Sequence, residues 1–435
     1  MAEVFDADIA DLQWIVDAYA ITFAGLLLAG GALGDRIGRE RALTIGFGIM
    51  AASNLLAALA GSVSVVIALR AVGGVGAAVM MPAALAAVSE VFSGEERARA
   101  IAVWASIAAA GGAFGPLLGG GMLAAAGWEA VFLLIGAIAL AGVVGTRLWV
   151  PELPGQRQGA FDGVGAALSV IGVAALVFLV IEGPIHPTSP LTLLSTVVAV
   201  VATIAFFRRQ AAIDYPLLPL ELFDDRNRVL GAGTLALAAI GFNGVFFVGA
   251  LLIQIGWGQS GLIAGLLLVP IGLTEVIVAN STVQLARRFG NIRLITIGLL
   301  SMAAGYLAMG LTPVGSYWWF ITAGIIAGIG NGLAIPLSIE RIVGSVEPAY
   351  AGVASSVNDM AIELGASLGI GLLGTIQRLW FESGLPEGST TTIADITGEV
   401  ERSAFRSGST AAFFLAAGVA LAAAIVARAR VPVTD

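Results

Sequence analysis

Four carboxyl groups and one guanidinium group lie inside long apolar stretches of the sequence. They belong to Asp17, Glu275, Asp359, Glu363 and Arg70. A carboxyl group that is removed from water favours its neutral form, so it can take up and release a proton near neutral pH. Ionisable residues within a membrane segment typically mark a substrate path or a proton relay. These residues therefore predict proton-linked transport. For each acid, the alternative is a polar group satisfied by a neighbouring helix or by water.

Spacing narrows the candidates for proton coupling. Asp359 and Glu363 are four residues apart, so they share one face of a helix. Asp17 and Arg70 each lie in the outward half of their own segment, and Asp17 is the acid of the first half that is positioned to pair with Arg70. An Arg inside the bilayer costs at least about 2.5 kcal/mol unless it meets a partner or water, although it can also snorkel to the interface. We expect Asp17, Arg70, Asp359 and Glu363 to couple transport to protons.

The elements that position these residues are membrane-spanning helices. Of the 435 residues, 58% are hydrophobic and only 11% are charged, whereas soluble chains are about 45–50% apolar and about 25% charged. Runs of about 20 apolar residues recur along the chain, and each is long enough to cross about 30 Å of hydrocarbon. The thirteen expected spanning segments are 12–33, 42–61, 63–88, 98–122, 128–149, 163–183, 191–208, 229–253, 260–285, 294–312, 316–340, 349–376 and 410–428.

The composition also limits the chemistry that the chain can perform. It contains no Cys and a single His, which argues against disulfides, thiolate catalysis and metal sites. No G-x-x-x-x-G-K-(S/T) loop is present, so the chain is not itself an ATPase. We expect no enzymatic activity, no cofactor, no metal and no nucleic-acid partner. The expected partners are the lipid bilayer, a small-molecule substrate and protons, and the expected state is a monomer.

The distribution of arginine predicts the orientation in the membrane. Seventeen of the 21 basic residues fall in one alternating set of connections, and three, Arg378, Arg402 and Arg406, fall in the opposite set. Because basic residues accumulate on the cytoplasmic side, the Arg-rich connections are expected to face the cytoplasm of a bacterium. Thirteen segments then place the N-terminus outside and the C-terminus inside the plasma membrane. The long outer loop 377–409 is expected to be mobile, and it has room for a short surface helix.

The chain contains an internal repeat. A shift of 252 positions aligns 33–38 with 285–290, and a shift of 254 aligns the glycines and the proline of 74–82 with those of 328–336. Parallel repeats are a transporter architecture with the substrate at the midplane between them. The two segments within 163–208 have no counterpart and are expected to be inserted between the repeats. This divides the chain into an N-terminal half, a linker with two inserted helices and a C-terminal half: 1–149, 150–228 and 229–435.

The stretch GALGDRIGRER (31–41) joins two expected helices and carries an ordered set of glycines and charges. Taken alone, it is explained by a positive-inside turn in which Gly38 adopts a left-handed conformation. The pattern resembles the signature of the major facilitator superfamily, from which Glu40 departs because a basic residue is usual there. The resemblance implies a cytoplasmic gate that is latched through Asp35 and Arg39. The matching residues are Gly31, Gly34, Asp35, Arg36, Gly38, Arg39 and Arg41.

A second stretch, GGAFGPLLGG (111–120), contains the pattern G-x-x-x-G-P-x-x-G-G. Its simplest explanation is a helix-packing face with a Pro kink. It resembles the antiporter motif of drug-exporting members of the superfamily, where the motif bends the helix and prevents leak. The resemblance therefore favours export over uptake. The matching residues are Gly111, Gly115, Pro116, Gly119 and Gly120.

Three further stretches narrow the resemblance. Arg70 lies in a segment that looks like the fourth-helix motif of the superfamily, whose Arg is linked to proton coupling, although the usual Gln three residues later is Gly73 here.

The stretches 12–39 and 351–374 are similar to fourteen-helix drug:proton antiporters, which also carry an inserted pair of helices. In that family another helix precedes the stretch LQWIVDAY. We therefore expect that the first helix is missing here, through a misplaced start codon or a truncated gene.

The expected fold is all-α and polytopic. It is a major facilitator fold with two pseudo-symmetric six-helix halves, two inserted helices and no first helix. The expected function is proton-coupled export of drugs or other small amphipathic compounds by alternating access. Two alternatives stay open, namely a facilitator for metabolite uptake and an inactive or regulatory membrane protein that is truncated at its start.

Overall fold

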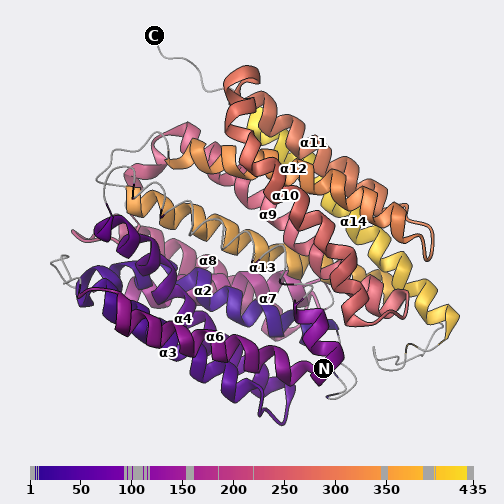
Figure 1. The fold of residues 1–435 in the computed structure, drawn as a ribbon, viewed down its shortest axis with the longest axis horizontal. Helices are drawn as coiled ribbons and strands as arrows, with labels where there is room; N and C mark the ends of the chain where they lie inside the picture. Colours follow the sequence, from indigo (N-terminus) through magenta and orange to yellow (C-terminus); the bar gives the residue numbers. More distant parts are fainter. Residues whose placement is uncertain are drawn as a thin grey trace.

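The computed structural model is built of helices (Figure 1). The structure describes residues 5, 7, 9–92, 96, 100, 111, 115, 118–152, 161–184, 186–218, 220–343, 351–385, 396 and 398–428. The α-helices are α2 (Ile9–Ile37), α3 (Arg39–Ala57), α4 (Val63–Val91), α6 (Trp128–Trp149), α7 (Gly163–Glu182), α8 (Pro190–Gln210), α9 (Arg226–Leu251), α10 (Gly261–Phe289), α11 (Asn291–Gly310), α12 (Tyr317–Val343), α13 (Ala351–Ser383) and α14 (Glu399–Arg428). A 3-10 turn, η1 (Leu220–Phe223), and a π-helical turn, η2 (Leu252–Gly256), complete the described elements.

Eleven helices among the described residues are long and apolar enough to cross a membrane. The chain is therefore a multi-pass membrane protein. Helix α3 matches the expected segment 42–61, but it is not among the eleven, since it begins with three charged residues and ends at Ala57. Most of the expected segment 98–122 lies outside the described residues, although 118–126 is helical.

The helices on either side of 377–409 are longer than the sequence predicts. We expected a long loop there, but α13 continues to Ser383 and α14 already begins at Glu399. Hydropathy ends a segment where charges begin, whereas ion pairs on a helix surface extend it. Arg378 pairs with Glu382 one turn later at 2.8 Å, and Glu399 pairs with Arg406 at 2.6 Å. The expectation of a loop over all of 377–409 was therefore wrong.

Close glycine contacts recur at equivalent positions of the two repeats. A Cβ at Gly46 of α3 would lie 2.7 Å from the carbonyl oxygen of Gly76 in α4. A Cβ at Gly298 of α11 would lie at the same distance, 2.7 Å, from the carbonyl oxygen of Gly330 in α12. The two pairs are related by the same shifts of 252 and 254 that align the sequence repeats. Small residues at both crossings let the backbones approach closely in a membrane.

The turn that follows each repeat's first aligned block has the same backbone conformation. Gly38 precedes α3 with φ 96° and ψ 148°, and Gly290 precedes α11 with φ 85° and ψ 142°. A side chain at either position would be strained, because only glycine adopts positive φ at little cost. The positive φ that we expected at Gly38 is therefore present.

The helices form two groups with the inserted pair beside them (Figure 1). Helices α2, α3, α4 and α6 pack together in the lower part of the view, and α9 to α12 and α14 pack together in the upper part. Helix α13 contacts α9 and α14 but also lies along α2. The inserted α7 and α8 pack on each other, and α7 touches both α2 and α13. The contact of α2, α7 and α13 therefore joins the two groups.

Asp162 ties the inserted helices together at one end. Its carboxylate accepts a hydrogen bond from the backbone N–H of Gly165 at 2.8 Å, which caps the start of α7. It also accepts from Arg209 Nε at 2.5 Å and from Gln210 Nε2 at 2.9 Å, both at the end of α8. Burial raises the pKa of Asp162, but the three hydrogen bonds and the charge of Arg209 outweigh burial and lower this pKa below its ordinary value. These three side chains form the Asp162 clasp.

Candidate functional site

Asp17 lies on α2 and faces α13. Its side chain is fully buried, and Oδ1 accepts a hydrogen bond from Ser367 Oγ at 3.0 Å. The second carboxyl oxygen, Oδ2, is buried without a hydrogen-bond partner and lies 3.8 Å from the position that a Cβ would take at Gly371. An ionisable residue buried inside a membrane segment typically marks a functional site. The structure therefore places this acid between the two groups of helices.

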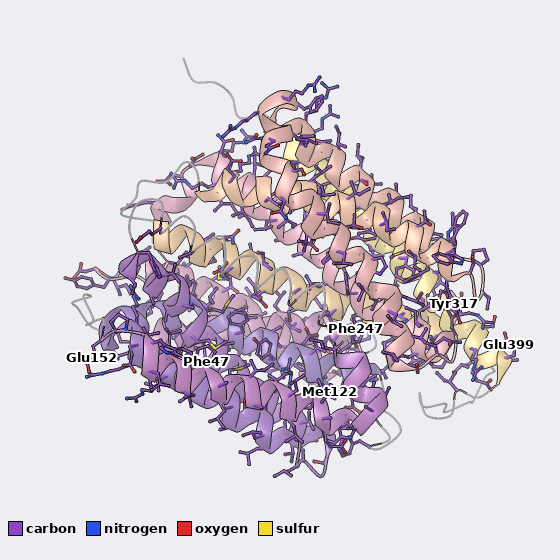
Figure 2. The ribbon with its side chains drawn as sticks, in the orientation of Figure 1. Phe47, Met122, Glu152, Phe247, Tyr317 and Glu399 are labelled. Atoms are coloured by element: carbon purple, nitrogen blue, oxygen red, sulfur yellow. The ribbon has the colours of Figure 1, made fainter. Side chains whose placement is uncertain are left out.

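Gln13 lies one turn before Asp17 and contacts the same helix. Its amide Nε2 donates to the carbonyl oxygens of Ile370 and Gly371 at 3.1 Å and 3.0 Å. Gln13 is fully buried, and Phe247 of α9 lies beside the contact, where the two groups of helices meet (Figure 2). Gln13 was not among the predicted site residues, because its side chain is not ionisable. Its spacing of four residues from Asp17 is the signal that identifies it.

Arg70 of α4 contacts another face of α2. Its Nε donates to the carbonyl oxygen of Ile15 at 2.9 Å, and its guanidinium carbon lies 4.4 Å from the centre of the Tyr19 ring. A guanidinium group at this distance over an aromatic face makes a cation–π contact. Arg70 is therefore held by a carbonyl group and a ring instead of lying free in lipid.

Arg70 and Asp17 do not pair, which corrects the expectation that Asp17 serves as the partner of Arg70. The two partners of Arg70 on α2, Ile15 and Tyr19, are four residues apart and share a face. Asp17 lies between them in sequence, so the helix turns its side chain toward α13. Helix α2 thus directs Asp17 toward α13, and it directs the groups that contact Arg70 toward α4.

Tyr19 connects the arginine to the acids of α13. Its ring lies under the guanidinium group of Arg70, Glu363 of α13 lies nearby, and its ring centre lies 5.7 Å from that of Phe23. Tyr19 was not among the predicted site residues, since an aromatic residue in an apolar segment most often serves packing. Its position at one helical turn from the Arg70-bound carbonyl of Ile15 becomes meaningful only when α2 and α4 are known to be neighbours.

The other two candidate acids lie on α13 before the Asp17 contact. Glu363 is one turn from Ser367, and it interacts electrostatically with Asp359 one turn before it. Asp359 Oδ1 accepts a hydrogen bond from Asn358 Nδ2 at 3.1 Å. The structure therefore brings Asp17, Glu363 and Asp359 along one α2–α13 contact, with Arg70 joined to it through Tyr19.

Glu275, the remaining acid within a segment, belongs to a separate cluster. It lies on α10 near Asn331 of α12, which is 3% exposed. Tyr306 of α11 is fully buried and interacts electrostatically with Glu275. This cluster lies inside the C-terminal group of helices and not at the α2–α13 contact.

The residues of 31–41 form the end of α2, the turn and the start of α3. Arg39 folds back so that its guanidinium nitrogen is 3.5 Å from the Cβ position of Gly34. Arg36 lies over the ring of Phe161, the residue before Asp162, at 5.7 Å. The side chain of Asp35 lies outside the described part of the structure. The motif residues lie as follows: Gly31, Gly34, Asp35 and Arg36 in the last turns of α2, Gly38 in the turn, and Arg39 and Arg41 in the first turn of α3.

Glu40, the position that departs from the signature, has a structural role. Thr44 Oγ1 donates to its Oε1 at 3.1 Å, and Arg147 of α6 lies 3.4 Å from the same oxygen. The acidic residue thus pairs with Arg147 where the start of α3 lies beside the end of α6, so a basic residue at this position would face Arg147 unfavourably.

The glycines of 111–120 are only partly described. Gly111, Gly115 and Gly119 are helical, and no described atom lies within 4 Å of the Cβ position of any of them. A Cβ at Gly120 would overlap the carbonyl oxygen of Gly261 at the start of α10. The end of this helix therefore touches the C-terminal group of helices. Pro116 lies outside the described residues.

Comparison with known proteins places the chain in a family. The family model described as the Major Facilitator Superfamily matches residues 1–370. The chain belongs to this superfamily. Members of this superfamily carry small molecules across membranes, so the resemblance seen in the motifs is confirmed and the fold is that of a polytopic transporter.

Several curated relatives within the Major Facilitator Superfamily are similar over most of the chain. The Multidrug efflux pump LfrA of Mycolicibacterium smegmatis is 35% identical over 399 residues, which covers 90% of this chain and 78% of that protein. The Tetracenomycin C resistance and export protein of Streptomyces glaucescens is 29% identical over 464 residues, with coverage of 97% and 85%. A methylenomycin A resistance protein of Streptomyces coelicolor is 32% identical over 385 residues, with coverage of 86% and 79%.

Solved structures of transporters share the fold. An inward-facing, occupied structure of a bacterial homolog to the human lysosomal transporter Spinster aligns with a TM-score of 0.69, covers 98% of this chain and 90% of that chain, and is 17% identical. A peptide transporter of the POT family aligns with a TM-score of 0.67 at 19% identity and covers 97% of this chain and 89% of that chain. At these identities the likeness concerns the arrangement of the helices.

Proposed function

We propose that the chain exports drugs or other small amphipathic compounds from a bacterium in exchange for protons. The observation that carries the proposal is the placement of Asp17, Glu363 and Asp359 along the contact between α2 and α13, with Arg70 joined to them by Tyr19. Relatives named for multidrug efflux, for tetracenomycin C export and for methylenomycin A resistance support the direction of transport. The glycine-rich stretch 111–120 supports export as well.

In the proposed mechanism, the two halves alternate access to a site between them. An acid at the α2–α13 contact binds a proton when the site is open to the outside and releases it when the site is open to the cytoplasm. Substrate takes the opposite route. A proton that falls through about 100 mV and about one pH unit supplies roughly 3.7 kcal/mol, which sustains an approximately 500-fold gradient of a neutral substrate. Such a gradient is sufficient for export without a nucleotide.

The proposal assigns roles to the candidate residues. Asp17, Asp359 and Glu363 exchange protons, and Arg70 shifts their protonation through its charge and its contact with Tyr19. The motif at 31–41 closes the cytoplasmic side, since Arg39 packs over Gly34 between α2 and α3. The proposal includes a monomer in the plasma membrane, an outer N-terminus, a cytoplasmic C-terminus and the division into 1–149, 150–228 and 229–435.

An accumulation assay tests the proposed function in cells. Bacteria that lack their own efflux pumps are made to express the chain, and the cellular content of fluorescent amphipathic drugs is followed with and without a protonophore. Export predicts a lower content that returns to the control level when the protonophore collapses the gradient. A higher content than in control cells would indicate uptake instead, and an unchanged content across a broad panel would indicate an inactive or regulatory protein.

A further inference from the structure

We propose that Gln13 is a positioning residue that fastens α2 to α13 and must release before this end of the molecule opens. The inference rests on the proposed function, since alternating access requires each end of the interface to open in turn. Gln13 lies near the start of α2, at the end that the distribution of arginine assigns to the outside. The contact of Gln13 with Ile370, Gly371 and Gly374 is called the Gln13 latch below.

The hydrogen bonds of the Gln13 latch can break without unfolding a helix. Gln13 Nε2 donates to the carbonyl oxygens of Ile370 and Gly371, at 3.1 Å and 3.0 Å. Within a helix each carbonyl already accepts from the N–H four residues later, so Gln13 uses the remaining lone pair of each oxygen. Its release therefore leaves α13 intact, and the two bonds add to the attraction between α2 and α13 only.

Gly374 makes the space that the Gln13 amide occupies, and Gly371 lets α7 approach α13 beside it. A Cβ at Gly374 would overlap Gln13 Nε2, so any other residue at this position would push the amide away. A Cβ at Gly371 would lie 3.2 Å from a side-chain carbon of Ile181 on α7. Thr375 Oγ1 also donates to the carbonyl oxygen of Ile181 at 3.2 Å. The inserted helix α7 thus supports α13 at the level where Gln13 binds it.

Two buried oxygens at this end lack partners, which favours opening toward water. Oε1 of Gln13 and Oδ2 of Asp17 are both buried without a hydrogen bond. A buried polar atom without a partner is unfavourable, and hydration relieves that cost when the contact separates. At the other end of the α2–α13 contact, Leu28 of α2, Val357 of α13 and Leu218 belong to one apolar cluster. Apolar side chains also pack at the Gln13 end, where Leu12 of α2 contacts a cluster that contains Phe381 of α13. The two unpartnered oxygens therefore distinguish the Gln13 end, and they make its opening respond to hydration.

The test measures how often the latched end opens. The chain contains no Cys, so one introduced thiol reports on one place. Ile370 is 7% exposed and lies on the side of α13 that faces Gln13, so Ile370→Cys is a buried reporter for a polar, membrane-impermeant maleimide. In this background, Gln13→Leu removes the donor and retains the volume. We expect maleimide labelling to become on the order of five- to tenfold faster, because two interhelical hydrogen bonds are lost.

A matched control and a second variant complete the experiment. Gln254→Leu removes a local hydrogen bond from Nε2, in the turn η2, to the carbonyl oxygen of Ala250 one turn earlier in α9, at 3.2 Å, and should leave the labelling rate of the reporter unchanged. Gly374→Ala displaces the amide of Gln13 and should accelerate labelling as Gln13→Leu does. The combined variant should be no faster than either single variant, because both changes break the same latch.

Three results would overturn the inference. They are an unchanged labelling rate in Gln13→Leu, an equal acceleration in Gln254→Leu, and full additivity of Gln13→Leu with Gly374→Ala. If Gln13→Leu does not yield folded protein, Gly374→Ala carries the test by itself. Labelling needs neither substrate nor a proton gradient, so a failure of the proposed function, seen as absent drug flux, is distinguishable from a failure of the latch.

Discussion

At the scale of single residues, the site depends on the ring of Tyr19 and on its contact with Arg70. The guanidinium carbon lies 4.4 Å from the ring centre, which is a cation–π contact. We predict that Tyr19→Phe retains proton-driven transport, since the ring is preserved, whereas Tyr19→Leu lowers its rate up to about tenfold, as the loss of a cation–π contact allows. Transport by purified protein in vesicles measures this difference. A strong loss in Tyr19→Phe would show that the hydroxyl group matters instead of the ring.

The Asp162 clasp makes a prediction about pH. Its lowered pKa stabilises the folded protein above the pKa of the unfolded chain, about 3.9, and this contribution disappears as the pH falls through the lower pKa of the folded state. Asp162→Asn keeps an acceptor for the N–H of Gly165 but loses the charge. It should destabilise the protein by about 1.5–3 kcal/mol at neutral pH, because charge-assisted hydrogen bonds are lost.

Thermal unfolding in detergent at a series of pH values checks the behaviour of Asp162→Asn. The difference from the unchanged protein should be constant between about pH 8 and about pH 5 and should shrink only near and below about pH 4. Asp162→Ala, which also removes the helix cap, should be less stable than Asp162→Asn at every pH. A difference that already vanishes near pH 6 would contradict a lowered pKa.

The ionisable residues of the site could be predicted from the sequence, but which residues contact each other could not. Asp17, Arg70 and Glu363 are identified because an ionisable group inside an apolar segment is costly. Gln13 and Tyr19 were missed, since a neutral polar or aromatic side chain gives no such signal by itself. The pairing of Asp17 with Arg70 was wrong, because it requires the rotation of α2 about its axis, which is set by the packing of α2 against α4 and α13.

At the scale of helices, the glycine crossings of the two repeats predict which helix positions tolerate a methyl group. Gly46→Ala and Gly298→Ala should each destabilise the protein by about 1–3 kcal/mol, because a Cβ would press on the backbone of α4 or α12. Gly48 lies on the same helix as Gly46, and no described atom outside that helix's own backbone lies within 4 Å of its Cβ position. Gly48→Ala should be neutral or stabilising by up to about 1 kcal/mol.

Thermal unfolding of the three purified glycine variants tests this prediction. The comparison of Gly46 with Gly48 is informative, because both replace Gly by Ala in α3 and differ only in the contact. Equal stability of the two variants would show that α3 and α4 do not pack as closely as the structure indicates.

The existence of the helices was predictable from hydropathy, whereas their ends were less so. The expected segment 410–428 became α14 from Glu399, because charged residues of its first turns pair on the helix surface. In α3 the opposite occurs, since the helix ends at Ala57 and the expected segment continued to residue 61. Hydropathy averaged over a window of residues follows the composition of a segment, whereas the residue at which a helix ends depends on local hydrogen bonds and ion pairs.

At the scale of the whole molecule, the internal repeat was the strongest guide to the fold. Its shifts of 252 and 254 reappear as equivalent glycine contacts in the two groups of helices. The sequence position of the inserted helices was predicted, but the helices against which they pack were not, because nothing in their composition indicates a neighbour. The structure shows α7 against both α2 and α13, where it braces the contact that carries the acids. The acids proposed to exchange protons thus lie beside α7, which is one of the two helices inserted between the repeats.

The central claim is that flux of a drug is coupled to protons through the α2–α13 contact. Its most direct test uses purified protein in vesicles with an imposed pH gradient, a fluorescent pH indicator inside and a panel of amphipathic drugs outside. Addition of a substrate should move protons across the membrane in the opposite direction. Arg70→Ala should abolish this signal, while Gly48→Ala should retain it. Drug flux that continues without proton movement, or proton movement that persists in Arg70→Ala, would contradict the account.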